Sequence, residues 1–355
     1  MLVSHESPIS ILEESKTYND YDYALVHLFE TQPEYFNFFK RSLAAGREVL
    51  LDNSIFELGE SFDPKKYIKY ITELNPSFYI VPDVLEDTQG TISQWGKFFL
   101  NYGMDLQDRT AIGVVQGSTY QELVDCYKFM SDHADYIAIS FDYKWYETVT
   151  TTNRSGREGM LDRWSAGRQH LISRLVHDGV WNSRKPHHLL GAALAREFAT
   201  YAPIASELNI RSLDTSNPVV AGLLGHRYMA NQGLNHKPSM MLADMIDVGV
   251  DPDQMADVLY NTSEFKKIIG KYHRSLVINP LIAGTLAMLV LSVNTILPAF
   301  ISLFSEQTAL RMSESVELIS VYGVALGTLF VFIVVGALFA LDLPTHLQSW
   351  RENKD

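Results

Sequence analysis

The stretch VLLDNSIFELGE at residues 49–60 decides how the fold is interpreted, because an apolar run in it ends on a polar turn. Val49, Leu50 and Leu51 lead directly into Asp52, and a turn through Gly59 follows. A short apolar run bounded by turn residues is typical of a buried strand. In α/β barrels the chemically active side chains follow the carboxyl ends of such strands. The stretch therefore predicts a buried strand that ends at Asp52 on the rim of a pocket.

Similar apolar runs alternate with helix-like segments through the first part of the chain. The strands are predicted at residues 23–29, 48–54, 77–84, 111–118, 135–141, 187–193 and 210–216. Among the helices between them, one begins with Asp63-Pro64 as N-cap and first turn, and another has Thr119 and Glu122 at capping-box spacing. This alternation is typical of a parallel sheet. It predicts an α/β protein with a (β/α)8 TIM barrel over residues 1–265, although an eighth strand cannot be placed.

Polar residues recur at the predicted strand ends. They are Asp52, Ser54, Asp83, Gln116, Ser140, Asp142 and Asp214. Each acid taken alone is also explained as a helix cap or a turn residue. Since the carboxyl ends of barrel strands meet on one face, their repetition favours a single pocket.

The bulk composition limits which partners and metals we expect. The formal net charge of the 355 residues is −13, so binding to nucleic acid would require a local basic face. The single cysteine, Cys126, excludes a cysteine-rich zinc site, and the adjacent His187 and His188 point to opposite faces of their strand. We therefore expect no metal and no cofactor.

The C-terminal part of the chain contains two long uncharged runs. No charged residue occurs in 275–305 or in 318–341, and roughly 20 apolar residues suffice to cross a bilayer. Lysine and arginine flank the pair of runs on both sides, at Lys266, Lys267, Lys271, Arg274, Arg351 and Lys354. This bias predicts a membrane anchor over 266–355, with transmembrane helices at about 276–304 and 318–341. The barrel domain and both termini would be cytoplasmic. Two buried core helices are the alternative.

Six motifs follow one another in a specific order. The chain carries LLDNSIFELG, YIVPDV, IGVVQGS, YIAISF, HLLGAA and SLDTSNP. Over about residues 20–230 this order resembles the tRNA-guanine transglycosylase superfamily. The residues of DNSIFELG and LDTSNP resemble the phage-type branch, which inserts 7-deazaguanines into DNA, more closely than they resemble the tRNA enzymes. The resemblance implies exchange of guanine in DNA, rather than in tRNA, for a 7-deazaguanine base such as preQ0.

The resemblance also implies roles for individual residues. Asp214 would be the nucleophile at C1′ of the nucleoside, and Asp52 the general acid/base for the departing and incoming base. A carboxylate can trap an oxocarbenium-like centre as an ester, and a second carboxyl with a raised pKa can transfer the proton. Asp83 and Gln116 would recognise the polar edge of the base. Further contacts to the base are implied for Ser54, Phe56, Gly117, Ser140 and Gly191.

The segment 144–188 is the candidate surface for a nucleic acid. It is rich in lysine and arginine and contains Trp145, Trp164 and Trp181, which could stack on bases. We predict phosphate contacts from Arg154, Arg157 and, outside the segment, Arg227. The alternative is a solvated arginine-bearing helix over 161–177 with tryptophans in the core.

Two other function classes stay open. One is a membrane-anchored protein that binds a nucleobase or nucleotide in a catalytically degenerate barrel. The other is a barrel lyase or glycoside hydrolase that acts on small molecules. The glycine pair of the family's Asp-Ser-Gly-Gly-Phe-Gln turn is replaced here by Ser54-Ile55, and YIAISF lacks the family's glycines. A homodimer is implied by the resemblance alone.

Overall fold

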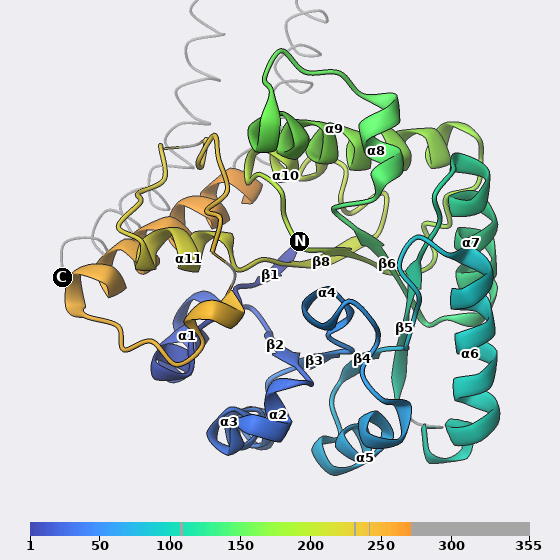
Figure 1. Ribbon diagram of the computed structural model, residues 1–355, viewed down its shortest axis with the longest axis horizontal. Coiled ribbons are helices and arrows are strands. Elements are labelled where there is room, and N and C mark those ends of the chain that lie inside the picture. The colour runs from blue at the N-terminus through green and yellow to red at the C-terminus, as the bar shows by residue number, and fades with distance from the viewer. Residues whose placement is uncertain (107–108, 231, 241, 271–355) are drawn as a thin grey trace, which may run out of the picture. The chain divides into compact units, whose positions relative to one another are not determined.

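The computed structural model describes residues 1–106, 109–230, 232–240 and 242–270, and these form a parallel barrel with helices outside it (Figure 1). Its strands are β1 (Leu2–Ser4), β2 (Asp22–Leu25), β3 (Val49–Asp52), β4 (Phe78–Ile80), β5 (Thr110–Val115), β6 (Tyr136–Ser140), β7 (His187–Leu190) and β8 (Ile210–Asp214). The eight strands form one sheet in the order β1-β8-β7-β6-β5-β4-β3-β2, and every neighbouring pair is parallel. The predicted barrel is thereby confirmed.

The strand that the sequence could not place is β1, at the start of the chain. It pairs with β8 so that Ser4 lies opposite Asp214. No ladder joins β1 to β2, but the segment just before β2 contacts β1: the amide of Asp20 donates to the carbonyl of Val3 at 2.9 Å, and the amide of Val3 donates to Asp20 Oδ2 at 2.9 Å. The barrel is therefore nearly closed.

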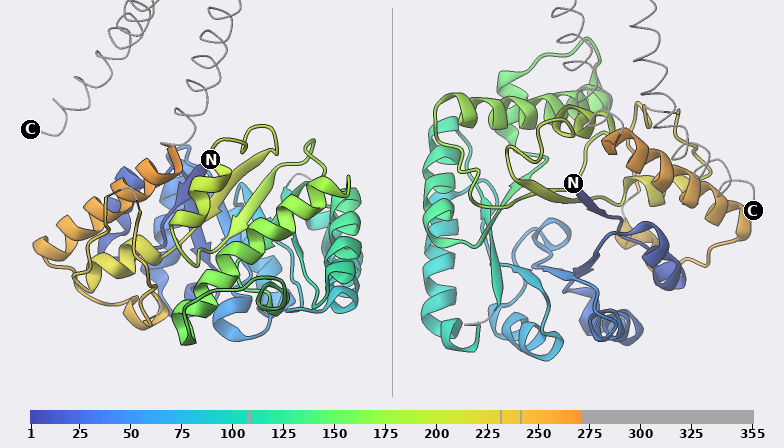
Figure 2. Two further views of the ribbon diagram at one scale, coloured as in Figure 1. Left: turned by 90° about the horizontal axis from the view of Figure 1, so that it is seen from above. Right: turned by 180° about the vertical axis from the view of Figure 1, so that it is seen from behind.

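Helices surround the strands, as the views from above and behind show (Figure 2). They are α1 (Leu12–Tyr18), α2 (Leu28–Thr31), α3 (Pro33–Ala44), α4 (Ile55–Leu58), α5 (Pro64–Leu74), α6 (Thr88–Tyr102), α7 (Tyr120–His133), α8 (Lys144–Val149), α9 (Gly156–His177), α10 (Arg196–Tyr201) and α11 (Asn217–Leu223), with short 3-10 turns η1 (Ile9–Ile11), η2 (Gly103–Leu106) and η3 (Leu242–Met245). Both predicted caps are confirmed: Asp63 accepts from the amide of Lys66, and Thr119 and Glu122 form a capping box. The predicted strand 23–29 is wrong beyond Leu25, where the chain turns into α2.

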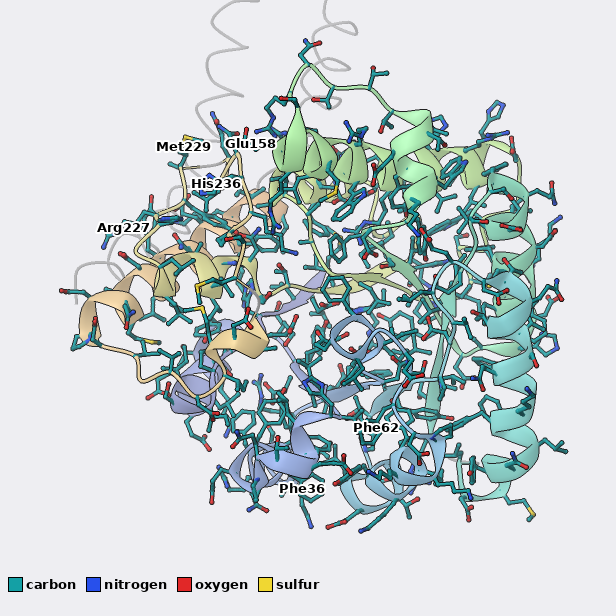
Figure 3. All side chains as sticks on the ribbon, in the orientation of Figure 1. Phe36, Phe62, Glu158, Arg227, Met229 and His236 are labelled. Carbon is teal, nitrogen blue, oxygen red and sulfur yellow. The ribbon has the colours of Figure 1, made fainter. Side chains whose placement is uncertain are left out.

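Aromatic side chains pack the helices around β2 and β3. Phe36 on α3 lies 5.9 Å from Tyr70 on α5 between ring centroids, and Phe62 lies 6.3 Å from the same ring (Figure 3). Phe29 on α2 adds an edge contact to Phe36 at 4.9 Å. Burial of such apolar surface stabilises the outer layer and holds the strand ends of this sector in place.

Residues 252–270 form a helix at the end of the described chain, and its Phe265 and Ile268 are buried in the core of the barrel domain. The predicted domain boundary between 265 and 266 falls within this helix and stays a prediction. In the part of the chain that is described, no helix is long and apolar enough to cross a bilayer. The predicted transmembrane helices at 276–304 and 318–341 lie outside the described residues.

Candidate functional site

A cavity of about 270 Å³ lies at the carboxyl ends of the strands. Its walls include residues of β2 through β8 and of the segment 237–243. Of the predicted site residues, it gathers Asp52, Phe56, Asp83, Gln116, Ser140, Arg157, Gly191 and Asp214. Ser54, Gly117, Arg154 and Arg227 are not among the lining residues. Asp52 and Asp214, which come from β3 and β8, thus border the same space.

Asp214 at the end of β8 is held by one of its two carboxylate oxygens. Oδ1 accepts from the amide of Gly191 at 3.0 Å and pairs with Nε2 of His188 at 3.0 Å. The other ring nitrogen of His188 pairs with Ser212 Oγ at 2.9 Å, and Ser212 is in turn bonded to Tyr136. Oδ2 of Asp214 accepts no hydrogen bond from any residue that is described, so it is available to a ligand. His187, by contrast, pairs with Tyr127 on α7, which confirms that the two histidines face opposite sides.

Gly191 needs to be glycine for this arrangement. Its φ is 64°, and a Cβ atom added to it would lie 2.5 Å from the Phe141 ring. Arg168 fixes the same loop, since it donates to the carbonyl oxygens of Leu190 at 2.8 Å and Gly191 at 3.0 Å. Arg168 is fully buried and pairs with Glu197 at 2.6 Å. Arg168 lies within the segment 144–188, but Glu197 neutralises its charge inside the fold, so Arg168 does not contribute to a basic surface.

Asp83 and Gln116 form a connected polar group. Gln116 donates from Nε2 to Asp83 Oδ2 at 2.7 Å, and Asn53 donates from Nδ2 to Asp83 Oδ1 at 2.8 Å. Burial raises the pKa of Asp83 to about 6, although both hydrogen bonds oppose this shift. Gln116 Oε1 accepts from the amide of Glu86 at 2.9 Å, which fixes the orientation of its amide. The structure thus places side by side two residues that are 33 positions apart in the sequence.

Five carboxyl groups that line the cavity have raised pKa values, those of Glu6, Asp52, Glu57, Asp83 and Asp142. Burial raises the pKa of Asp52 well above its usual range, and the charges of Glu57 and Asp214 add to the effect. Burial also raises the pKa of Glu57 to about 7 and that of Glu6 well above its ordinary value. Oε2 of Glu57 is buried and has no hydrogen-bond partner among the described atoms. Such mutual repulsion favours protonated carboxyls, which are the form that can donate a proton.

Glu6 and Lys237 line the cavity but were not predicted as site residues. Glu6 follows β1, the short strand that the sequence does not predict, so no local pattern indicates that Glu6 lines the cavity. Lys237 lies in a segment without a strong secondary-structure signal. Glu57 lies in the stretch 49–60, and its spacing from Asp52 is the sequence feature that indicates a second acid near the same strand end.

The turn after β3 explains why Ser54 stays outside the cavity. Ser54 has a φ of 58°, a left-handed conformation that residues other than glycine rarely adopt. Asn53 Oδ1 accepts from the amide of Ile55 at 3.0 Å, and Ser54 Oγ accepts from the amide of His27 at 3.3 Å. Ser54 therefore shapes the turn that presents α4. Gly117 is likewise constrained by packing, since an added Cβ would lie 2.8 Å from the amide nitrogen of Leu123.

An aromatic wall borders the cavity. The ring of Phe141 lies 5.7 Å from Phe56 and 5.6 Å from Trp164 between centroids, and all three residues line the space. A planar heterocycle can stack on such rings. The other two tryptophans predicted to stack on bases pack elsewhere, Trp145 against Tyr120 and Trp181 against His187.

The predicted phosphate-binding arginines have different surroundings. Arg154 pairs with Asp162 and donates to the carbonyl of Asn235 at 2.6 Å. Arg227 pairs with Asp257 and lies at the outer edge of the domain, where Figure 3 labels it. Arg157 has no carboxylate partner within the described ranges and donates to the carbonyl of Pro238 at 3.0 Å. Of the three, Arg157 is the one that borders the cavity.

Comparisons with known proteins leave the family open. No family model matches the chain, and no curated protein sequence matches it. In the structure as described, no three or more histidine, cysteine, aspartate or glutamate side chains are grouped to hold a metal ion. The chemistry of the site is therefore argued from the cavity and its own side chains.

Proposed function

We propose that this protein is a transglycosylase that exchanges guanine in a polynucleotide, DNA in preference to tRNA, for a 7-deazaguanine base. The observation that carries the proposal is that Asp52 and Asp214 border one cavity at the carboxyl ends of the barrel strands. Those are the two residues for which the resemblance implies proton transfer and nucleophilic attack. The carboxyl face is also where barrel enzymes hold their active sites.

In the first step of the proposed reaction, Oδ2 of Asp214 attacks C1′ of the target nucleoside. The bond from C1′ to N9 breaks, its electron pair passes to the base, and protonated Asp52 supplies a proton to the departing guanine. In the second step N9 of the incoming base attacks C1′, the ester to Asp214 breaks, and the N9 proton returns to Asp52. The raised pKa of Asp52 supports its role as the proton donor.

Recognition of the base is assigned to Asp83 and Gln116. Their mutual hydrogen bond leaves a fixed pattern of donors and acceptors, and an unpaired buried polar group costs about 1–3 kcal/mol. The cavity of about 270 Å³ is slightly smaller than the roughly 300–1,000 Å³ of drug-sized ligand sites, which suits a small heterocycle. Phe141 and Trp164 provide the stacking surface.

We also propose that residues 266–355 anchor the enzyme in a bilayer as a two-helix hairpin, with the barrel and both termini in the cytoplasm. The support is the pair of uncharged runs and the lysine and arginine residues that flank them. We propose a homodimer as well, and its only support is the resemblance.

The decisive experiment is incubation of the full-length chain with guanine-containing DNA or tRNA and a labelled 7-deazaguanine. We expect label to be retained in DNA, and the Asp214→Asn variant to retain none. Asp178→Asn, which changes a surface carboxylate at the end of α9, is the matched control and should retain wild-type activity. Label in tRNA would correct the substrate, and label in neither polymer would refute the transferase.

One observation favours a second candidate, a nucleobase-binding protein without catalysis. Arg154 and Arg227 are engaged by carboxylates, which reduces the charge available to a polyanion. A binder would hold guanine equally well in the wild type and in Asp214→Asn, and would exchange no base. Equilibrium binding of guanine to both proteins, measured beside the label assay, separates the two candidates.

A further inference from the structure

Lys237 is a cation in a cavity dominated by acids. It is half-buried, lines the cavity, and its Nζ lies 4.5 Å from the centroid of the Phe141 ring. Glu6, Asp142 and Asp214 line the same space, yet Lys237 forms no ion pair or hydrogen bond with any residue in the described part of the chain. Burial lowers the pKa of Lys237, and the charges of Glu6 and Asp142 oppose that shift. Among the described residues, its ammonium group thus contacts the Phe141 ring but no carboxylate.

Arg157 is the second cation of this wall. Its guanidinium donates to the carbonyl of Pro238, the residue next to Lys237, at 3.0 Å. This bond ties the segment that carries Lys237 to the first turn of α9. Neighbouring arginines are neutralised, since Arg154 pairs with Asp162 and Arg163 with Glu147. In the described structure Arg157 has no such acid, so its charge remains available.

The amino end of helix α9 adds positive charge to the same wall of the cavity. It spans 22 residues, and Ser155 at its amino end makes no side-chain capping hydrogen bond. The partial positive charge of that helix end adds to the charge of Arg157 and Lys237. The cations that line the cavity thus come from α9 and from the segment after Asn235, and its carboxyls come from the strand ends and from α4.

We propose that Lys237 and Arg157 form a subsite for the phosphate group esterified to the nucleoside whose base occupies the cavity. This inference rests on the proposed function, because it assumes that the base lies against Asp83 and Gln116. A phosphate brought near the carboxyls would be repelled, while the two cations offer charge-assisted hydrogen bonds. The subsite would thus orient the nucleotide, with its base toward the strand ends and its phosphate toward α9.

The test compares equilibrium binding of guanosine with that of guanosine 5′-monophosphate and 3′-monophosphate to the full-length chain. Hydrogen bonds to charged groups contribute about 1.5–3 kcal/mol, so the favoured monophosphate should bind roughly 10- to 100-fold more tightly than guanosine. Lys237→Gln and Arg157→Gln should each remove most of this advantage and leave guanosine binding unchanged. Lys237→Arg should preserve it. Arg41→Gln, which changes a surface cation on α3 that pairs with Glu13 outside the cavity, is the matched control and should also preserve it.

The outcomes are separable. An unchanged phosphate advantage in both glutamine variants, with guanosine still bound, would overturn the subsite and leave the proposed function standing. Equal weakening of guanosine and of its monophosphates by Lys237→Gln would also overturn it, because the lysine would then serve only to balance Glu6 and Asp142. Failure of the wild type to bind any of these compounds would refute the proposed function together with the subsite. The 5′ and 3′ arms show which neighbouring phosphate is held, and a short guanine-containing oligonucleotide shows whether a polymer supplies it.

Discussion

Two regions stood out in the sequence, the acids at the strand ends and the arginine-bearing segment 144–188, and the structure treats them differently. The acids converge on one cavity, and neither Asp214 Oδ2 nor Glu57 Oε2 has a hydrogen-bond partner among the described residues. The arginines do not form one basic face, because Arg154, Arg163 and Arg168 each pair with a carboxylate. Position relative to a strand end therefore indicated which residues line the cavity more reliably than the composition of a segment did.

Removal of Arg168 should produce the largest change in stability. Arg168→Met leaves Glu197 buried without its partner, and breaking a buried pair costs about 3–5 kcal/mol. The measurement is thermal or denaturant unfolding of the full-length chain. Arg163→Met breaks a pair that is partly exposed to solvent and should cost no more than about 1 kcal/mol. Equal effects of the two variants would mean that the buried pair does not support the loop at Gly191.

Truncation of Gln116 should weaken base recognition. Gln116→Ala leaves Asp83 Oδ2 and the amide of Glu86 without the partner that Gln116 provides, so guanine binding should fall by about 1–3 kcal/mol, or roughly 5- to 150-fold. Calorimetric titration with guanine measures the change. Gln121→Ala, which removes an exposed side chain on α7, is the control. Unaltered guanine affinity in Gln116→Ala would exclude this residue from the base-binding wall.

Stability should depend on pH through Glu57, with a smaller effect. Burial raises the pKa of Glu57 from its usual 4.5 to about 7, so the folded state binds a proton that the unfolded chain releases. Folding stability should therefore decline as pH rises from about 5 to about 7. Glu57→Gln should decline less over this range, as measured by the thermal midpoint at each pH. Glu73→Gln, a surface change on α5, should follow the wild type, and a parallel curve for Glu57→Gln would contradict the assigned burial.

The smallest effect concerns salt-dependent DNA binding. Arg157→Gln should weaken binding and reduce the slope of log affinity against log salt by about one, because one phosphate contact is lost. Arg227→Gln should leave the slope unchanged, since Arg227 is engaged by Asp257 away from the cavity. Fluorescence anisotropy at several salt concentrations gives both slopes. Identical slopes for the two variants would remove Arg157 from the path of the polymer.

Much of the fold was predictable because each long strand combines an apolar run with a polar end, as in residues 49–54. β1 was not predicted because Leu2–Ser4 is only three residues long and is recognisable only by its pairing with β8. Because β1 was not predicted, Glu6, which follows it, was not recognised as a residue of the site. Lys237 could not be predicted, because its place in the cavity depends on hydrogen bonds from α9 to a loop far along the chain. The buried role of Arg168 depends likewise on carbonyl groups of β6 and β7 that no local pattern encodes.

The claim on which the chemistry depends is that Asp214 bonds covalently to the sugar while Asp52 serves the base from the same cavity. Mass spectrometry of the full-length chain, incubated with a guanine-containing oligonucleotide and digested, tests this directly. We predict an abasic-sugar adduct on the peptide that contains Asp214, which disappears on addition of a 7-deazaguanine and never forms in Asp214→Asn. An adduct that forms equally in Asp214→Asn, or one located on a different carboxylate, would contradict the mechanism.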